Sequence, residues 1–449
     1  MRLMKTNNSS RIKSHSKVNV FFRNLDSKTI NKIARICEYT KRKSGKISPT
    51  ALIFGFLLMV SKKRNTFSDW AIEIGLLVGQ TISKQSVFER MSLQTESFVK
   101  KVLECVMQET LLSGSIKLKG ILKHFKNVYI DDSTTIHLPD ELSDVFPGNV
   151  SNGIRKSQAK IHAMFNLTKN SFSFFHLHSF RNNDQSLSGD VLPFLKRGDL
   201  CIRDLGFTVL NVMMKFIEQG IYFVARKGFN VRVYDVKTKE EINILKTLRK
   251  KGFIDEEVLI GKTHQIKCRL VIVPIPRQQS EARKRRARKD RDLRLNHSKY
   301  YYELLDYNVF VTNISMEKCS ATEIAQLYKL RWRIEIIFKS WKSCFSLEKL
   351  IHLQCKNESR VKCNIFLMLI YIYLFHVIWL NYHEKQIHKK TEASRLSLLK
   401  MANFFCQHFA EILSAKNNKS ILEQIKKHCL YDTRKDRENA EQHHFNMAA

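Results

Sequence analysis

The sequence predicts an α/β protein: a mixed sheet with flanking helices, a β-rich insertion and a helical N-terminal region. Three observations predict this fold class. Helical patterns dominate residues 19–120, where Pro49 is the only proline. From Asn127 onward, short β-type runs alternate with turns and a helical crossover, which suits a mixed sheet. A second group of β-type runs fills residues 221–276, ahead of a last strand and a long helical segment.

The chain is strongly basic along its whole length. Its 449 residues carry 77 Lys and Arg against 42 Asp and Glu, a formal net charge of +35. This excess makes a polyanion the expected partner, bound with a strong salt dependence. An anionic membrane surface is the competing partner, but the basic residues are not collected in one amphipathic segment.

Cysteine usage and apolar patterning indicate a cytoplasmic protein. Ten cysteines are scattered with no CxxC spacing, so neither a zinc ribbon nor a thioredoxin-type pair is supported, and a reducing cytosol is expected. Residues 1–18 are polar and basic, which predicts a disordered arm and no secretory signal. The apolar run over residues 365–380 is short of the ~20 residues that a bilayer needs, so we expect a buried helix of the sheet domain and no membrane span.

Within residues 19–120, the segment 68–91 has the layout of a helix-turn-helix. An apolar helical face is followed by the turn Gly79-Gln80-Thr81 and by a second short helix. A plain helical hairpin is the alternative. If the polyanion partner is DNA, a basic, helical N-terminal region favours contact with it here. The residues expected to make that contact are Lys84, Gln85 and Arg90.

Residues 121–220 are predicted to start the sheet. A β-type run over residues 128–130 ends in Asp131 and Asp132, and runs over 161–167 and 172–179 follow. Another strand, residues 200–203, leads into Asp204. Taken alone, Asp204 before a Leu-Gly turn reads as a turn residue.

Residues 221–306 are predicted to be an inserted β unit, closed by a basic run over residues 277–299 that reads as a solvated helix. Residues 307–385 return to the sheet domain with a strand over 307–314, and residues 386–449 read as a helical and polar tail.

The segment 321–350 reads as one long helix, because it contains no Gly or Pro. Four polar residues share one side of it, next to an apolar face: Tyr328, Arg331, Glu335 and Lys342. A solvated helix face with salt bridges is the plain interpretation. A hydroxyl, a guanidinium, a carboxylate and an ammonium on one stripe also suit a phosphate-handling site.

The spacing Tyr-x₂-Arg-x₃-Glu-x₆-Lys resembles the Tyr-Arg-Glu-Lys signature of the bacterial DDE transposases of the insertion-sequence-four family. The segment IDDST around Asp132 resembles the first-aspartate motif of that family, and IRDLGF around Asp204 resembles the second. The resemblance covers roughly residues 65–385 and implies an RNase H-like catalytic core. It aligns Asp132 with the first ligand, although Asp131 stays an alternative because side chains alternate along a strand.

This resemblance implies cut-and-paste DNA transposition at terminal inverted repeats. Asp132, Asp204 and Glu335 would hold two Mg²⁺ ions, with Mn²⁺ as a substitute, and Tyr328, Arg331 and Lys342 would bind DNA phosphates. The implied partners are double-stranded DNA, at the element ends and the target, and a second copy of the chain in a synaptic homodimer. The protein would act in the bacterial cytoplasm at the nucleoid. The alternatives are a decayed, inactive copy that only binds DNA ends and, more remotely, an RNA-binding protein.

Overall fold

The computed structural model describes residues 25–41, 46–112, 118, 120–169, 171–228, 231–289, 297–351, 356–387, 396–414 and 419–431. The chain forms two compact units. The helical unit comprises Met1–Gly114, Ser359–Ala393 and Phe405–Glu423. The sheet unit comprises Ser115–Glu358, Ser394–Phe404 and Gln424–Ala449.

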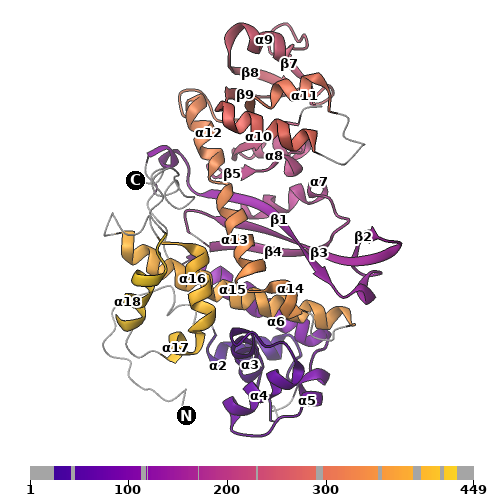
Figure 1. Ribbon diagram of the computed structural model, residues 1–449, viewed down its shortest axis with the longest axis vertical. Helices are drawn as coiled ribbons and strands as arrows, with labels where there is room; N and C mark the ends of the chain where they lie inside the picture. The colour runs from indigo at the N-terminus through magenta and orange to yellow at the C-terminus, as the bar shows by residue number, and fades with distance from the viewer. Residues whose placement is uncertain are drawn as a thin grey trace. The chain divides into compact units, whose positions relative to one another are not determined.

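Helices build the helical unit (Figure 1). They are α2 (Ser27–Ile36), α3 (Pro49–Ser61), α4 (Phe67–Val78), α5 (Lys84–Glu89), α6 (Leu93–Leu112), α15 (Glu358–Ile387) and α17 (Phe409–Ser414). A side-chain cap starts each of α2 to α5. α16 (Leu398–Gln407) and α18 (Lys419–His428) have residues in both units. A capping box of Thr66 and Asp69 starts α4, and Gly79 ends it in the left-handed region at φ 71°. The segment 68–91 therefore folds as a helix, a glycine turn and a second short helix.

α15 holds the apolar run that could be mistaken for a membrane span. Among the described residues it is the one helix long and apolar enough to cross a bilayer, and 94% of the apolar window within Glu358–Trp379 is buried inside the protein. The prediction of a buried helix is confirmed. In the division of the chain into two units, α15 falls in the helical unit from Ser359 onward.

One sheet organises the other unit. Its strands are β1 (Val128–Leu138), β2 (Pro147–Ser151), β3 (Ile154–Asn166), β4 (Ser171–Ser179), β5 (Leu200–Arg203), β6 (Tyr222–Arg226), β7 (Val233–Asp235), β8 (Ile254–Ile260), β9 (Ile266–Pro274) and β10 (Tyr307–Thr312). The order is β2-β3-β1-β5-β6-β10-β9-β8-β7, and β4 pairs with β3. β1 pairs antiparallel with β3 and parallel with β5, which in turn is parallel to β6. The mixed sheet with flanking helices is the predicted fold class.

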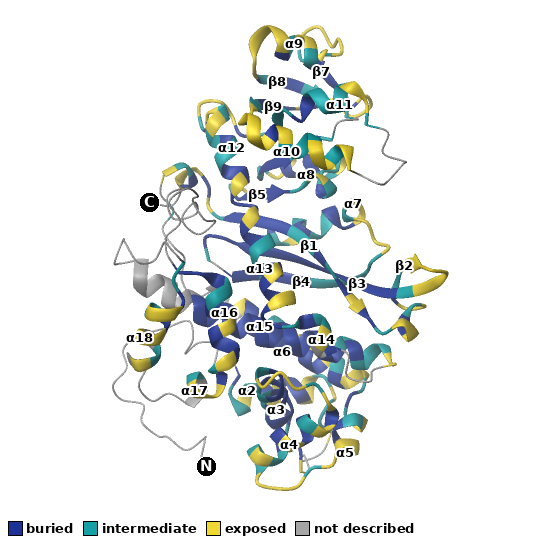
Figure 2. Cartoon of the chain, in the orientation of Figure 1, coloured by how far each residue is buried: buried dark blue, intermediate teal, exposed yellow. Residues whose placement is uncertain are grey.

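Helices and turns of the sheet unit connect and flank these strands. The α-helices are α7 (Asp184–Leu187), α8 (Leu210–Glu218), α9 (Ile244–Lys251), α10 (Arg277–Arg288), α11 (Lys299–Leu304), α12 (Ala321–Lys329), α13 (Trp332–Ser343) and α14 (Leu347–Ile351). The 3₁₀ turns are η1 (Gly120–His124), η2 (Asp140–Leu142), η3 (Ser188–Phe194) and η4 (Leu205–Phe207). Figure 2 shows the central strands buried and the outer side of α10 exposed. Met213 and Phe216 of α8 pack into a core with Cys201, Phe223 and Val311 of the sheet.

The structure differs from the sequence prediction in three elements. β1 does not end at the aspartates but continues to Leu138, because β3 pairs with it from Tyr129 onward. The strands of residues 221–306 do not form a separate sheet: β6 lies between β5 and β10, and β9 extends the same ladder from β10.

The third difference concerns the predicted single helix over residues 321–350, which is three helices, α12, α13 and α14. Between α12 and α13, Leu330 and Arg331 keep helical backbone angles but donate hydrogen bonds three residues back instead of four. Ser346, with φ at 52°, separates α13 from α14. The break at Leu330 carries no Gly or Pro, so neither of the usual helix breakers marks it.

Candidate active site

Parallel pairing places Asp132 and Asp204 side by side. β1 and β5 are in register with Asp131 opposite Arg203, so the next residue on each strand, Asp132 or Asp204, occupies an equivalent position. Asp132 continues along β1, and Asp204 stands where β5 gives way to η4. Two residues 72 positions apart in sequence are thus brought together by one strand register.

Alternation along β1 separates Asp131 from Asp132. The Asp131 side chain is 0% exposed and accepts from Arg203 Nη2 at 2.6 Å and from His162 Nε2 at 2.5 Å. Burial alone would raise the pKa of Asp131, but Arg203 and His162 outweigh it and lower the pKa. The Asp132 side chain, 17% exposed, lies on the face of Arg331 instead. The geometry groups Asp132, and not Asp131, with the other predicted ligands.

Arg331 joins the three predicted carboxylates. Its Nη1 lies 3.2 Å from Asp132 Oδ2, its Nε lies 3.9 Å from Asp204 Oδ1, and its Nη2 donates to Glu335. The turn between α12 and α13 supplies Arg331, and Glu335 follows it in the first turn of α13, which lies against β1 (Figure 1). The helix break therefore aims the guanidinium at the ends of both strands.

The charges at this site are unevenly compensated. Burial raises the pKa of Asp132 to about 7, against the opposing effects of Arg331 and of the Ser133 amide, which donates at 2.8 Å. Burial also acts to raise the pKa of Asp204, but Arg331, the Leu205 amide and other donors outweigh it and lower the pKa. One guanidinium is thus shared by three carboxylates, and of the two aspartates Asp132 is the less stabilised as an anion.

Tyr328 is the second donor to the site. Its hydroxyl donates to Asp204 Oδ1 at 2.9 Å, and its ring packs 4.9 Å from Phe310 of β10. Burial and the neighbouring Asp204 raise the pKa of Tyr328 above its ordinary value, so the hydroxyl keeps its proton at neutral pH. The Arg331 guanidinium lies 5.7 Å from the centre of the same ring.

The fourth residue of the predicted stripe, Lys342, is not gathered at the carboxylates. Lys342 is exposed in the last turn of α13, two turns beyond Glu335. Among the described residues, no hydrogen bond or ion pair joins Lys342 to Asp132, Asp204 or Glu335. Trp332, which follows Arg331 in the chain, is 59% exposed.

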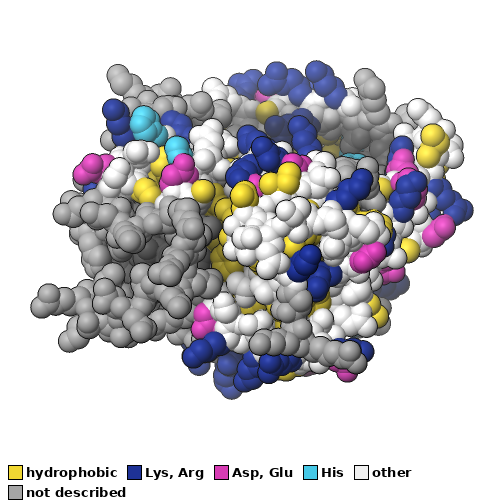
Figure 3. Space-filling model, turned by 90° about the horizontal axis from the view of Figure 1, so that it is seen from below, with side chains coloured by type: hydrophobic (Ala, Val, Ile, Leu, Met, Phe, Trp, Pro, Cys, Tyr) yellow, Lys and Arg dark blue, Asp and Glu magenta, His cyan; other side chains and the backbone are white. Residues whose placement is uncertain are grey.

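Three predicted DNA-contacting residues lie on or beside α5 in the helical unit. Lys84 and Gln85 are exposed, and Gln85 donates to Glu89 at 2.8 Å. Arg90 caps the helix and its guanidinium contacts the Tyr39 hydroxyl at 3.5 Å. Lys and Arg side chains gather over several parts of the face drawn in Figure 3, with fewer Asp and Glu among them. Such a surface is electrostatically suited to a polyanion.

A neighbouring hydrogen-bond network around Asp184 was not predicted from the sequence. Asp184 of α7 accepts from Ser133 Oγ at 2.9 Å and from Lys160 Nζ at 2.8 Å. Asp184 also approaches Gly206, where a side-chain Cβ would stand 2.9 Å from its Oδ2. Asp184 thus bonds the residue after Asp132 and lies close to Gly206, two residues after Asp204. The sequence signal for this contact is that Ser133 and Gly206 belong to the two aspartate motifs, whereas Asp184 lies in neither.

Comparison with known proteins identifies the family. The family described as "Transposase DDE domain" matches residues 123–374, more than half of the chain. The chain belongs to this family. The family predicted from the Tyr-Arg-Glu-Lys signature is therefore confirmed.

Curated relatives of this DDE transposase come from insertion sequences. The transposase for element IS231F of Bacillus thuringiensis subsp. israelensis is 29% identical over 319 residues, 66% of this chain and 66% of that protein. The transposase for IS231C of subsp. berliner is 27% identical over 79% of this chain and 77% of its own length. The transposase for IS1151 of Clostridium perfringens is 23% identical, covering 86% and 85%. The alignment thus spans about two thirds of the IS231F transposase and more of the other two.

Among solved structures, the chain resembles a piggyBac transposase in a synaptic complex with hairpin DNA. The TM-score is 0.46 at 10% sequence identity, and the match covers 96% of this chain and 88% of that chain.

The carboxylates of this DDE transposase fit a hard divalent cation by their chemistry. All three offer oxygen donors, which Mg²⁺ and Mn²⁺ prefer. Among the described residues, one group of three or more ligand side chains has its ligand atoms within 4.8 Å of one another, and that group does not include Asp132, Asp204 or Glu335. These three carboxylates therefore stand further apart, around the guanidinium of Arg331. Arg331 Nε is buried and makes no hydrogen bond there. A cation and Arg331 would therefore compete for the same oxygens.

Proposed function

We propose that this DDE transposase moves its insertion sequence by cut-and-paste transposition, cleaving and joining DNA at terminal inverted repeats. The observation that carries the proposal is the convergence of Asp132, Asp204 and Glu335 on one guanidinium, from two strands and a helix. Carboxylates that come together from distant segments of the chain are the kind of ligands that bind divalent cations for phosphodiester cleavage.

In this proposal Asp132, Asp204 and Glu335 hold two Mg²⁺ ions, for which Mn²⁺ substitutes. The ions, when bound, activate the attacking oxygen and stabilise the leaving oxygen. The pKa of Asp132, about 7, supports the assignment, because a buried carboxyl with too little positive charge around it gains most from a cation.

Arg331 and Tyr328 are proposed to bind DNA phosphates beside these carboxylates. Both are buried donors aimed at the site, and a guanidinium matches phosphate oxygens with two parallel hydrogen bonds. When cations neutralise the carboxylates, Arg331 becomes available for phosphate. Exposed Lys342 on α13 is proposed to bind the same strand further along, about 10 Å from Glu335 along the helix axis.

DNA binding is proposed to extend to α5 of the helical unit, through Lys84, Gln85 and Arg90. The net charge of +35 supports a large sequence-independent share of the affinity. Joining two element ends requires both in one complex, so a homodimer at synapsis is proposed, acting in the cytoplasm at the bacterial nucleoid.

A cleavage assay on a labelled duplex that carries the element's own end tests the proposal. We expect Mg²⁺-dependent cutting by the wild type, no cutting in EDTA, and loss of cutting in Glu335→Gln while a gel shift persists. Glu257→Gln is the matched control, because Glu257 is exposed on β8 and pairs with Lys267 at the surface. Binding without cutting by the wild type would favour a decayed, binding-only copy. Cutting that survives Glu335→Gln would remove Glu335 from the site.

A further inference from the structure

A second cluster of ligand side chains lies in the sheet unit, apart from the three carboxylates. His162 of β3 stands directly opposite His176 of β4 in the antiparallel ladder. His178, two residues further along β4, projects from the same face as His176. Asp190 of η3 completes the group. These four residues are called the histidine cluster below.

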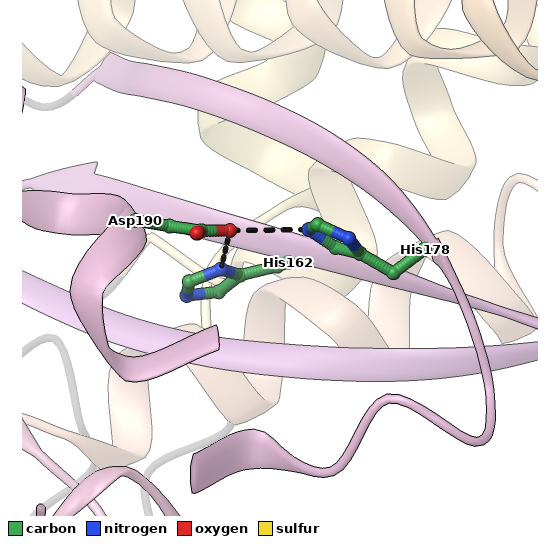
Figure 4. A group of neighbouring side chains, drawn as sticks. All are labelled: His162, His178 and Asp190. Atoms are coloured by element: carbon green, nitrogen blue, oxygen red, sulfur yellow. Dashed lines mark hydrogen bonds and ion pairs between the residues drawn. The ribbon is translucent and has the colours of Figure 1, made fainter. Parts of the chain in front are cut away.

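One carboxylate oxygen of Asp190 contacts the imidazoles of both His162 and His178, as the dashed lines in Figure 4 show. This oxygen, Oδ2, is 3.3 Å from His162 Nδ1, 3.1 Å from His178 Nε2 and 3.2 Å from His176 Nδ1. Tetrahedral zinc with bonds of about 2.0–2.1 Å keeps its donor atoms roughly 3.3 Å apart. The donor atoms of His162, His178 and Asp190 all lie within 4.8 Å of one another. Small movements would therefore bring them to one cation.

A hydrogen-bonded support behind His162 matches that of a metal-binding imidazole. His162 is 0% exposed, its Nδ1 faces Asp190, and its Nε2 hydrogen-bonds Asp131 at 2.5 Å. Asp131 is held in turn by Arg203. In metal sites a ligating histidine characteristically donates its other ring N–H to a carboxylate, which fixes its tautomer and orientation. The buried Asp131–His162 pair supplies that support.

We propose that the histidine cluster binds one transition-metal cation of the zinc class, at a site separate from Asp132, Asp204 and Glu335. The ligands are His162, His178 and Asp190; His176, whose Nδ1 lies 3.2 Å from Asp190 Oδ2 but which is outside that group of three, would have to turn toward the ion to become a fourth. Imidazole nitrogens suit Zn²⁺ and similar ions, whereas Mg²⁺ takes oxygen donors. The partial exposure of the His176 and His178 side chains, 39% and 22%, leaves a route for the ion to enter.

Such an ion would be structural and would fix the segment that flanks the active site. It would tie β3 and β4 to η3, and η3 follows directly from α7, whose Asp184 bonds Ser133 beside Asp132. Ser188 at the start of η3 also accepts from Arg203 Nη1 at 3.0 Å. The cation would thus hold the loop that supports both aspartate motifs.

Hydrogen bonds alone are the competing explanation. Without a metal, one or more protonated imidazoles donate to Asp190 and the cluster is an ion-pair network. The two explanations differ in metal content and in the response to added zinc, whichever way the cleavage assay turns out.

The full-length chain, purified in millimolar Mg²⁺ without chelator, tests the proposal by metal analysis. Glu335→Gln is used as the background, so that binding at the three carboxylates is weakened. We expect about one equivalent of zinc per chain. We also expect that Co²⁺ added to the metal-stripped protein gives the visible absorption of a tetrahedral nitrogen-rich site. His178→Ala should lose most of the bound metal, and His176→Ala should weaken its binding.

His264→Ala is the matched control, because His264 lies exposed in the turn between β8 and β9. The melting temperature is measured with and without zinc for each variant. Retained zinc and a zinc-dependent rise in melting temperature, both lost in His178→Ala and kept in His264→Ala, would support the site. If His178→Ala does not fold, His176→Ala, at a half-exposed position, and Asp190→Asn are compared with His264→Ala instead. No retained metal and no zinc-dependent shift in the background protein, or equal binding by His178→Ala and His264→Ala, would overturn it.

Discussion

Replacing Arg331 by methionine should weaken the metal-free protein and tighten its binding of divalent cations. The substitution removes the one guanidinium that contacts Asp132, Asp204 and Glu335. Removing one partner of a buried ion pair costs about 3–5 kcal/mol. Here Asp204 and Glu335 are 39% and 34% exposed, so their share is screened, and we expect a loss of about 2 kcal/mol. For a unit of this size that is roughly 4–8 °C in melting temperature.

The loss of stability in Arg331→Met should depend on pH and on bound divalent cations. The pKa of Asp132 is about 7 in the folded protein against an ordinary 3.8, so its carboxyl contributes stability that is full below 3.8 and is lost as pH rises through 7. The deficit of Arg331→Met should therefore be larger at about pH 8 than at about pH 6. Added Mn²⁺ replaces the missing positive charge, so it should restore the melting temperature and bind the variant about tenfold more tightly than the wild type.

Thermal unfolding in EDTA and in Mn²⁺, together with calorimetric titration of Mn²⁺, measures both effects. Cleavage should fall although metal binding improves, because the proposed phosphate contact is lost. Arg269→Met is the matched control, since Arg269 pairs with Asp255 at 2.6 Å far along the sheet and should lose stability without gaining metal affinity. An Arg331→Met protein with unchanged stability in EDTA, or with weaker Mn²⁺ binding, would refute the view that Arg331 competes with cations.

Three further predictions follow from burial and charge. Asp131→Asn should lower the free energy of unfolding by about 3–5 kcal/mol, because it leaves the buried Arg203 uncompensated. Asp132→Asn should fold normally and lose Mg²⁺-dependent cleavage. Urea unfolding measures the first effect and the end-cleavage assay the second. Lys227 is 5% exposed and burial lowers its pKa to about 8, so its contribution to stability is present above 10.5 and lost as pH falls through 8. The free energy of unfolding of Lys227→Met should therefore exceed that of the wild type by up to about 3 kcal/mol at neutral pH, and urea titrations should no longer show that pH dependence. Wild-type stability that is equal at neutral pH and above pH 10.5 would contradict this prediction. Trp341→Ala should lower the free energy of unfolding by about 3–5 kcal/mol, because Trp341 is fully buried. Trp332 is exposed on the same helix, so Trp332→Ala should change that free energy by no more than about 0.5 kcal/mol. Similar losses for the two variants in chemical denaturation would mean that α13 is packed differently.

Local patterns were enough for the fold class and for the family. β-type runs and turn residues predict most of the strands, because strand periodicity and turn chemistry are properties of a few consecutive residues. The spacing of Tyr328, Arg331 and Glu335 is likewise local, and it pointed to a family that the comparisons confirm. The capping box and glycine of α4 are also legible from short stretches.

The sequence by itself determined the family, the mixed α/β class and the three acidic residues that the aspartate motifs and the helix supply. Only the tertiary structure decided that Asp131 faces a buried arginine while Asp132 faces Arg331, because that choice depends on the register of β1 against β3 and β5. It also decided that Arg331 sits at a helix break and that residues 221–306 extend one continuous sheet. The histidine cluster joins β3, β4 and η3 in the same way. Each of these depends on pairings between residues far apart in the chain, which no local window of sequence contains.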